Sequence, residues 1–435
     1  MFNQKEGVFM DYYKTEELEE RAILVGVHTG CIDELSDTTD ESMKELEQLA
    51  ETAGAVTVGT MVQNRAAVEN ATYLGEGKLD ELKAACGGLN ANLIIFDDEL
   101  SPIQLRNLER ELSLRVIDRT MLILDIFARR ASTKEGKIQV ELAQLNYMLP
   151  RLSGLGTQLS RLGAGIGTRG PGETKLETDR RHIRRRISHL REELREVKKH
   201  RDLLRTRREK DNSSMVALVG YTNAGKSTLL NTLTGSEVFA ENKLFATLDP
   251  TIRGLELSDG RKVMLVDTVG FIRKLPHHLV EAFKSTLEEA VFADVLIHVI
   301  DGANPEFDQH IRVVDNILES LKAANKPTIC VFNKIDKVEE RSDIPLAVRT
   351  ADAVVEISAK TGEGLEKLVQ TLESLVPGKK KRVKLLIPFS DGAALSRLHN
   401  EQTVLSEQYE AEGTLLDAYV DTQAYAEFKN YLCEV

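Results

Sequence analysis

Residues 220–227 read Gly220-Tyr-Thr-Asn-Ala-Gly225-Lys226-Ser227, which matches the phosphate-binding pattern GxxxxGK[ST]. The apolar run Met215–Val219 precedes this loop, and Ser227–Leu233 follows it with helical character. A strand, a glycine-rich turn and a helix in this order let backbone N–H groups and a helix N-terminus surround phosphate. We expect Lys226 to reach the β- and γ-phosphates of a nucleotide and the Ser227 hydroxyl to bind Mg²⁺.

Three further motifs follow in the order expected of a nucleotide domain. Asp267-Thr-Val-Gly270 comes after the apolar run Lys262–Val266, so the Asp can hold Mg²⁺ through water and the Gly270 N–H can sense the γ-phosphate. Asn333-Lys-Ile-Asp336 follows Thr328–Phe332. Asp336 can accept two hydrogen bonds from guanine, and because adenine lacks the exocyclic amine, this residue predicts selection of GTP.

Two further segments complete the predicted contacts with the base and with Mg²⁺. Ser358-Ala-Lys360 follows an apolar run, and the Ala359 N–H is expected to donate to guanine O6. Asn333 is expected to brace the loops, and the Lys334 stem is expected to cover the base. The switch segment is Phe245-Ala-Thr-Leu-Asp-Pro-Thr251, in which Thr247 is favoured over Thr251 as the residue that completes the Mg²⁺ shell.

Two positions in this region predict how hydrolysis is controlled. Many GTPases place a water-orienting glutamine directly after DxxG, and here that position is Phe271. A phenyl ring cannot polarise water, so the intrinsic rate should be slow and an outside partner or ion should complete the site. Asn223 is a candidate to hold K⁺ near the phosphates; the alternative is that it only stabilises the loop.

The rest of the chain predicts three further parts around the nucleotide domain. Alternating apolar runs and amphipathic stretches indicate an α/β unit with a parallel sheet before it. Apolar residues at steps of four and three, Ile138 to Leu152 and Ile183 to Val197, indicate an antiparallel helical hairpin with a coiled-coil seam. The predicted segments are a tail at 1–20, an α/β domain at 21–132, the hairpin at 133–212 with a glycine-rich tip at 153–172, the nucleotide domain at 213–377 and a small α+β domain at 383–435.

Composition and charge bound the class of protein. The 435 residues are 42% hydrophobic and 29% charged, as in soluble proteins with several domains. We expect neither a membrane helix nor a signal peptide, and the four scattered cysteines favour a reducing cytoplasm over a disulfide framework or a zinc site. The net charge of −12 argues against DNA as a partner, yet residues 180–210 hold 14 Lys and Arg against 5 Asp and Glu. This basic island is a candidate contact for a polyanion.

These residues together resemble the HflX family of translation-factor-class GTPases. The resemblance is carried by GYTNAGKS at 220–227, FATLDPT at 245–251, DTVGFIR at 267–273 and NKID at 333–336, and by GAGIGTRGPGETKLETDRR at 163–181. It implies binding to the large (50S) ribosomal subunit through rRNA and ribosomal proteins, hydrolysis of GTP to GDP and phosphate there, and splitting or rescue of stalled or stress-inactivated ribosomes. On the ribosome we expect the chain to be a monomer. In this family pattern Phe271 is expected.

The residues expected to contact nucleotide and metal form one set. Lys226, Thr247 and Gly270 are assigned to catalysis, and Ser227 and Thr247 to Mg²⁺. The nucleotide contacts are Gly220, Tyr221, Thr222, Asn223, Ala224, Gly225, Lys226, Ser227, Phe245, Ala246, Thr247, Leu248, Asp249, Asp267, Thr268, Val269, Gly270, Asn333, Lys334, Ile335, Asp336, Ser358, Ala359 and Lys360.

Three other functions remain open at this point. The chain would fit a regulatory GTP-binding module with a protein partner, in which the hairpin is a docking surface. It would also fit a ribosome-assembly GTPase, or an RNA chaperone that uses the hairpin. Seven glycines between Gly154 and Gly172 and the arginines Arg151, Arg161, Arg169, Arg180, Arg181 and Arg184–Arg186 favour an RNA-facing hairpin.

Overall fold

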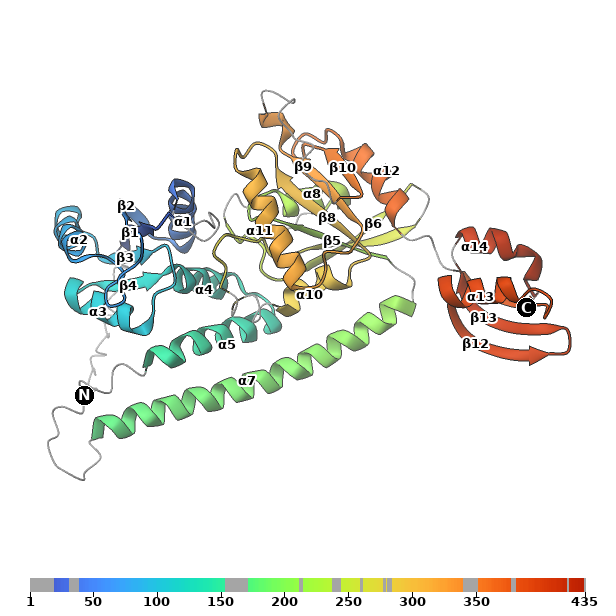
Figure 1. Ribbon diagram of the computed structural model, residues 1–435, viewed down its shortest axis with the longest axis horizontal. Coiled ribbons are helices and arrows are strands. Elements are labelled where there is room, and N and C mark those ends of the chain that lie inside the picture. The colour runs from blue at the N-terminus through green and yellow to red at the C-terminus, as the bar shows by residue number, and fades with distance from the viewer. Residues whose placement is uncertain are drawn as a thin grey trace, which may run out of the picture. The chain divides into compact units, whose positions relative to one another are not determined.

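The structure is a computed structural model that divides into two compact units, Met1–Asp125 and Ile126–Val435, described here in turn (Figure 1). It describes residues 19–30, 39–152, 171–210, 214–236, 244–258, 261–276, 279, 284–338, 351–376, 381–420 and 422–433. Residues 153–170 of the predicted tip, with Arg161 and Arg169, lie outside this part of the chain. Within the described residues, no helix is both long enough and apolar enough to cross a membrane.

The first unit is an α/β domain whose strands are all parallel. The sheet order is β2-β1-β3-β4, and β1 lies at its centre with side chains buried from Ala22 to Val27. This confirms the predicted parallel sheet. The elements are β1 (Arg21–His28), α1 (Asp40–Ala53), β2 (Val56–Asn64), α2 (Glu76–Leu89), β3 (Leu93–Phe96), α3 (Pro102–Leu112), β4 (Arg115–Asp118) and α4 (Arg119–Arg130), which runs into the second unit.

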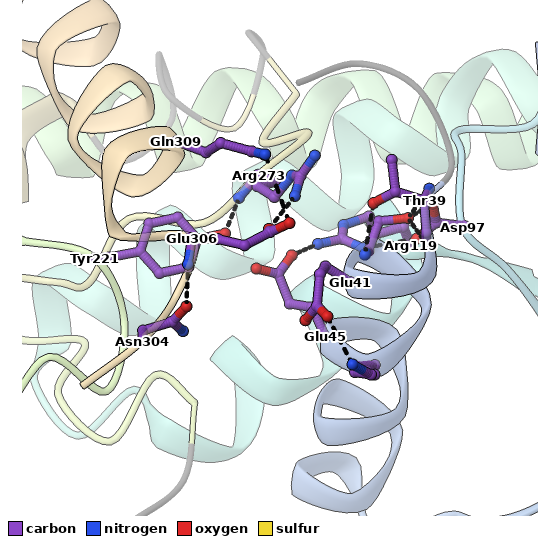
Figure 2. A network of polar contacts seen from close by, with 12 residues as sticks. Thr39, Glu41, Glu45, Asp97, Arg119, Tyr221, Arg273, Asn304, Glu306 and Gln309 are labelled. Carbon is purple, nitrogen blue, oxygen red and sulfur yellow. Dashed lines mark hydrogen bonds and ion pairs between the residues drawn. The ribbon is translucent and has the colours of Figure 1, made fainter. Parts of the chain in front are cut away.

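A buried charge cluster joins the carboxyl ends of two of these strands to α1. The Arg119 guanidinium, 1% exposed, donates to Asp97 at 2.7 Å and also contacts Glu45 (Figure 2). Ser42 donates to the second oxygen of Asp97 at 2.8 Å. A buried charge is tolerated only when it is paired and hydrogen-bonded, so this cluster fixes α1 against the strand ends.

The predicted helical hairpin is present as two long helices that pack together. They are α5 (Lys134–Arg151) and α7 (Pro171–Lys210). Their seam contains Ile138, Leu142, Leu145, Leu149, Ile183, Ile187, Leu190, Leu194 and Val197, which are the residues expected from the heptad spacing apart from Leu152. The helices are antiparallel, because Glu141 pairs with Arg186 whereas Glu135 pairs with Arg201.

The central domain is a six-stranded sheet of order β10-β9-β8-β5-β7-β6, parallel except at the β6–β7 edge. Alternate residues of β9 face opposite layers, since Ile329 and Val331 pack with α8 and α12, whereas Cys330 and Phe332 pack with α11. The elements are β5 (Ser214–Gly220), α8 (Lys226–Thr234), β6 (Thr251–Glu256), β7 (Lys262–Asp267), α10 (Lys284–Phe292), β8 (Val295–Asp301), α11 (Phe307–Ser320), β9 (Thr328–Asn333), η3 (Ile335–Lys337), β10 (Ala353–Glu356) and α12 (Leu365–Leu375).

The C-terminal part is a small antiparallel sheet of order β11-β13-β12 with helices, as expected for an α+β domain. The strand β12 was not predicted, because most of its side chains are exposed and its sequence lacks an apolar alternation. The elements are β11 (Lys381–Ile387), α13 (Gly392–Glu401), β12 (Thr403–Glu410), β13 (Gly413–Val420), α14 (Thr422–Glu427) and η5 (Phe428–Tyr431).

One histidine lies inside the central sheet. His298 on β8 is 3% exposed and pairs in register with Val219 of β5 and Cys330 of β9. Burial, with a smaller contribution from the positive charge of Lys226, lowers the pKa of His298 to about 3. The imidazole is therefore neutral in the folded protein across the physiological range.

The central domain should lose stability in mild acid through His298. The unfolded chain takes up a proton near pH 6.5 and the folded chain does not, so this contribution is complete above pH 6.5 and declines as pH falls towards 3. The free energy of unfolding should drop by up to about 1.4 kcal/mol per pH unit from this group. Hydrogen exchange of β5 and β8 amides between pH 6.5 and 4.5 measures it. His298→Gln should flatten the pH dependence, whereas His182→Gln, at an exposed position on α7, should leave it steep.

Candidate functional site

The glycine-rich loop at the end of β5 takes its shape from two close approaches. Gly220 has φ 151°, and a Cβ there would lie 2.2 Å from the carbonyl oxygen of Val299. Gly225 has φ 98°, and its Cβ would lie 2.3 Å from the Asn333 side-chain nitrogen. Any larger side chain would push the loop away from its neighbours, so both positions require glycine. The loop then leads directly into α8, and the first residues of α8 line the same pocket as the loop.

Lys226 is folded over this loop. Its Nζ donates to the carbonyl oxygens of Gly220 at 3.0 Å and Tyr221 at 2.8 Å, and the residue is 6% exposed. Burial lowers the pKa of Lys226 to about 8, although the charge of Asp267 acts in the opposite direction. The ammonium group is thus held in a desolvated position beside the loop, where an anionic group would be strongly attracted.

Three side-chain oxygens meet at one point beside Lys226. The Ser227 hydroxyl lies 2.6 Å from Asp267 Oδ2 and 2.8 Å from Thr247 Oγ1, and Thr247 Oγ1 lies 3.0 Å from the same Asp267 oxygen. Thr251, the alternative switch threonine, instead begins β6 and pairs in register with Asp267. Two hydroxyls and a carboxylate are hard oxygen donors, so this arrangement fits the ligands that Mg²⁺ prefers.

The DxxG segment is docked on the glycine-rich loop by its backbone. The Phe271 N–H donates to Gly220 at 3.1 Å, and its carbonyl accepts from the Thr222 N–H at 2.7 Å. The Phe271 ring is 1% exposed. A Cβ on Gly270 would lie 2.7 Å from Thr222 Cα and 3.1 Å from Lys226 Nζ, so only glycine fits between these loops. The C-terminal end of the segment therefore brings the Gly270 backbone to the pocket, whereas the buried Phe271 ring contributes no polar group there.

The base-recognition motifs meet at the ends of β9 and β10. Asn333 donates to the Ala224 carbonyl at 2.8 Å and accepts from the Ala359 N–H at 2.9 Å, so it braces two loops as its position suggested. The Ala359 N–H, expected to face guanine O6, is thus engaged by Asn333. Lys334 donates to the Asn223 carbonyl at 2.8 Å and to Asp301 at 2.7 Å.

Asp336 is exposed at the outer side of these loops. The Ser358 hydroxyl donates to one of its oxygens at 2.7 Å. This hydrogen bond lowers the pKa of Asp336, so the carboxylate stays ionised. A fixed, ionised carboxylate at this place can accept hydrogen bonds from a purine ring.

A pocket connects the glycine-rich loop with the switch segment. Its lining contains ten of the seventeen residues predicted in the glycine-rich loop, the switch segment and DxxG. The predicted residues outside the lining are Gly220, Tyr221, Ala224, Leu248, Asp249, Asp267 and Val269. Leu248 is 2% exposed, and the Asp249 carboxylate bonds to Ser132 and Thr133. The lining residues are Thr222, Asn223, Gly225, Lys226, Ser227, Thr228, Phe245, Ala246, Thr247, Thr268 and Gly270.

Sequence reasoning gave no role to Arg273, which follows the DxxG segment. Its guanidinium is 2% exposed and pairs with Glu306 at 3.0 Å, while its N–H donates to the Tyr221 hydroxyl at 2.9 Å (Figure 2). The Tyr221 ring stacks on His310 with centroids 3.7 Å apart. These contacts join the residues after the DxxG segment, and the Tyr221 ring of the glycine-rich loop, to the N-terminal part of α11. The signal available in the sequence was an arginine placed directly after the apolar pair Phe271-Ile272.

The basic island on α7 is less positive than its composition suggested. Arg186 makes a two-point contact with Glu141 at 2.6 and 2.8 Å, and Lys198 and Arg201 both contact Glu288 of α10 at 2.7 Å. By contrast, the side chains of three arginines near the tip end are exposed: Arg181, Arg184 and Arg185. Among the α7 side chains that the structure describes, these three arginines form an exposed positive group towards the tip end.

Family descriptions match most of the chain. Residues 40–128 match the GTP-binding GTPase N-terminal region, residues 130–208 the GTP-binding GTPase middle region and residues 215–334 a 50S ribosome-binding GTPase. A solved GTP-binding protein from Sulfolobus solfataricus in complex with GDP is 28% identical, covers 82% of this chain and 98% of its own, and has a TM-score of 0.45.

Curated relatives match at nearly full length. GTPase HflX from Lacrimispora saccharolytica is 51% identical over 94% of this chain and 96% of its own. GTPase HflX from Escherichia coli K12 is 44% identical over 91% of this chain and 92% of its own. Identities of 44–51% over nearly the whole length of both chains show that this chain belongs to the HflX family of GTPases.

Proposed function

We propose that this GTP hydrolase uses Mg²⁺ held by Ser227 and Thr247, with Asp267 acting through water. The observation that carries this assignment is the meeting of their three oxygens within 3.0 Å of one another beside Lys226. When bound, the ion would neutralise charge on the β- and γ-phosphates. In this proposal Lys226 binds the same phosphates, the Gly270 backbone contacts the γ-phosphate, and the Thr247 loop closes over the metal.

We propose that Asp336 reads guanine through its ionised carboxylate. Asp336→Asn should lower the affinity for GDP by at least about 100-fold, because an amide nitrogen would face the N1–H and amine donors of the base. The same variant should gain affinity for xanthosine nucleotides, whose second carbonyl can accept from the new amide. Calorimetry with GDP and XDP measures both effects. Asp352→Asn, on a carboxylate that bonds the Thr328 N–H, is the matched control, and an unchanged GDP affinity in Asp336→Asn would contradict the assignment.

The partner that we propose is the large ribosomal subunit, contacted by the hairpin. Two features support it: the match of residues 215–334 to a 50S ribosome-binding GTPase and the exposed arginines on α7. Arginines that meet RNA phosphates release counterions, so binding should weaken as salt rises. Because the position after DxxG holds Phe271, whose buried ring cannot orient water, turnover should be slow until the subunit completes the site. The target is a stalled or stress-inactivated ribosome in a cytoplasm.

Replacing Arg181, Arg184 and Arg185 with Ala should reduce cosedimentation with purified large subunits by about tenfold. GTP affinity should stay unchanged, since these residues lie on α7 and the nucleotide motifs do not. The matched control replaces Arg195 and Lys199, which are exposed but paired with Glu192 and Glu196. Large subunits should also raise the GTPase rate of the unmodified chain. Stimulation by a protein partner without ribosomes would favour the regulatory-module alternative instead.

We propose K⁺ as a second ion, bound with the help of Asn223. This residue lines the pocket, is exposed, and has φ 60°, a conformation that Asn tolerates better than most residues. GTP turnover should be several times faster in K⁺ than in Na⁺ at equal ionic strength. Asn223→Gly keeps the backbone conformation and removes the amide, so it should abolish the difference. Equal rates in both salts for the unmodified chain would eliminate the potassium site.

A further inference from the structure

The Asp249 carboxylate joins the switch segment to the first turn of the hairpin. One of its oxygens accepts from the Ser132 N–H at 2.8 Å, the Ser132 hydroxyl at 2.7 Å and the Thr133 N–H at 2.9 Å. The other oxygen accepts from the Thr133 hydroxyl at 2.5 Å. Thr133 is the N-cap of α5, and its hydroxyl accepts from the Gly136 N–H at 2.9 Å. The carboxylate is therefore part of the cap that begins the hairpin.

The first turn of α5 is shaped to receive this carboxylate. A Cβ on Gly136 would lie 2.3 Å from Asp249 Oδ1 and 3.2 Å from the Thr133 hydroxyl oxygen. Glycine inside a helix costs about 1 kcal/mol relative to alanine. Gly136 is buried in this turn, and the space that its missing Cβ leaves is occupied by the switch carboxylate. A residue that is unfavourable for the helix thus admits a contact from outside it.

Along the chain, Asp249 lies close to Thr247, one of the residues proposed to hold the metal. Thr247 lies two residues earlier, and two residues span at most about 7 Å. Thr251 lies two residues later and is fixed in β6 against Asp267. Leu248 and Phe245 are buried, and the Phe245 ring meets Phe127 of α4 edge-on with centroids 4.7 Å apart. Because only the buried Leu248 separates Thr247 from Asp249, we expect a large movement of Thr247 away from Ser227 to disturb the Asp249 contact as well.

We infer that Asp249 is a positioning residue that couples the Thr247 loop to the first turn of the hairpin. While the Asp249 carboxylate is hydrogen-bonded to Ser132 and Thr133, Thr247 is held beside Ser227 and Asp267. When Thr247 moves away from Ser227, the Asp249 carboxylate is lost from the N-cap of α5. The inference rests on the proposed role of Thr247 at the metal, and it assigns to Asp249 a contact with the hairpin where the family pattern suggested a contact with nucleotide.

A second contact keeps the hairpin attached when the first is lost. Glu288 of α10 is 9% exposed and accepts from Lys198 and Arg201 of α7 at 2.7 Å each. Arg201 also bonds Glu135 of α5 at 3.0 Å. This charged group does not involve the switch segment. Loss of the Asp249 contact should therefore alter the first turn of α5 and the Thr247 loop without detaching the hairpin.

The test removes the contact from each side of the interface in the full chain. Asp249→Ala deletes the acceptor, and Gly136→Ala places a methyl group against it while raising helix propensity. Each variant should lower kcat for GTP by about tenfold, with the affinity for GDP changed by less than about twofold. The double variant should be no worse than either single one, because both remove the same contact. Thermal unfolding of each variant checks that it is folded. If the Asp249 contact has no part in turnover, Gly136→Ala should be folded and as active as the unmodified chain.

Controls and a second readout separate the outcomes. Arg253→Ala on β6 and Gly87→Ala, a helical glycine whose added Cβ meets no described atom within 4 Å, should leave kcat unchanged. Hydrogen exchange of residues 132–137 should be slower with a non-hydrolysable GTP analogue than with GDP, and this difference should vanish in Asp249→Ala. Equal exchange with both nucleotides, or kcat unchanged in both single variants, would overturn the inference.

Thr247→Ala distinguishes this inference from the proposed function. If Thr247→Ala lowers kcat but Asp249→Ala and Gly136→Ala do not, the metal assignment stands and the coupling is wrong. If Thr247→Ala has no effect on kcat, the metal assignment fails and the coupling fails with it. Lower kcat in all three variants, with nucleotide-dependent exchange in the first turn of α5, is the result expected.

Discussion

The nucleotide site depends on the side-chain amide of Asn333. One end of this amide holds the Ala224 carbonyl of the phosphate-binding loop, and the other accepts from Ala359 in the loop after β10. The two loops are far apart in sequence and lie at the same edge of the sheet because their strands are parallel. Two hydrogen bonds of one buried group therefore set the distance between the glycine-rich loop and the loop after β10.

Burial then determines which charges are available in the folded domain. Lys226 is desolvated yet surrounded by carbonyl oxygens, so its pKa falls while it remains suited to a polyanion. Asp267 is also buried, and its pKa is raised by desolvation in spite of the nearby lysine. A magnesium ion with a triphosphate would satisfy both groups together. A buried ammonium group beside a buried carboxylate and two hydroxyls therefore favours a charged ligand over a neutral one.

The sequence predicted those parts of the fold that rest on periodic burial. The heptad spacing identified the seam from Ile138 to Val197, and the alternation of apolar runs with amphipathic stretches indicated the parallel sheet of the first unit. The strand β12 escaped because an exposed edge strand carries little apolar signal. Position relative to strand ends was equally informative for the site, where Ser227, Thr247 and Asp267 come together as the motif order implied.

Contacts between distant polar side chains were beyond reach of the sequence. Nothing in the spacing indicates that Arg186 would be neutralised by Glu141, or that Arg273 would be buried against Glu306. The Asp249 contact with Ser132 is of the same kind, since it joins two segments across 117 positions. Such pairs depend on which helix faces which loop, and a single sequence contains no periodic signal for that relation.

The long helix α7 also has a mechanical consequence. Arg201 is fixed at Glu288 near the base of this 40-residue helix, whereas Pro171 begins its opposite end. The helix between these two residues is about 45 Å long, so each degree of tilt at Arg201 displaces the Pro171 end by about 0.8 Å. A rearrangement of one turn beside the switch would thus produce a displacement several times larger at the Pro171 end of α7, because the helix would pivot about the Arg201–Glu288 ion pair.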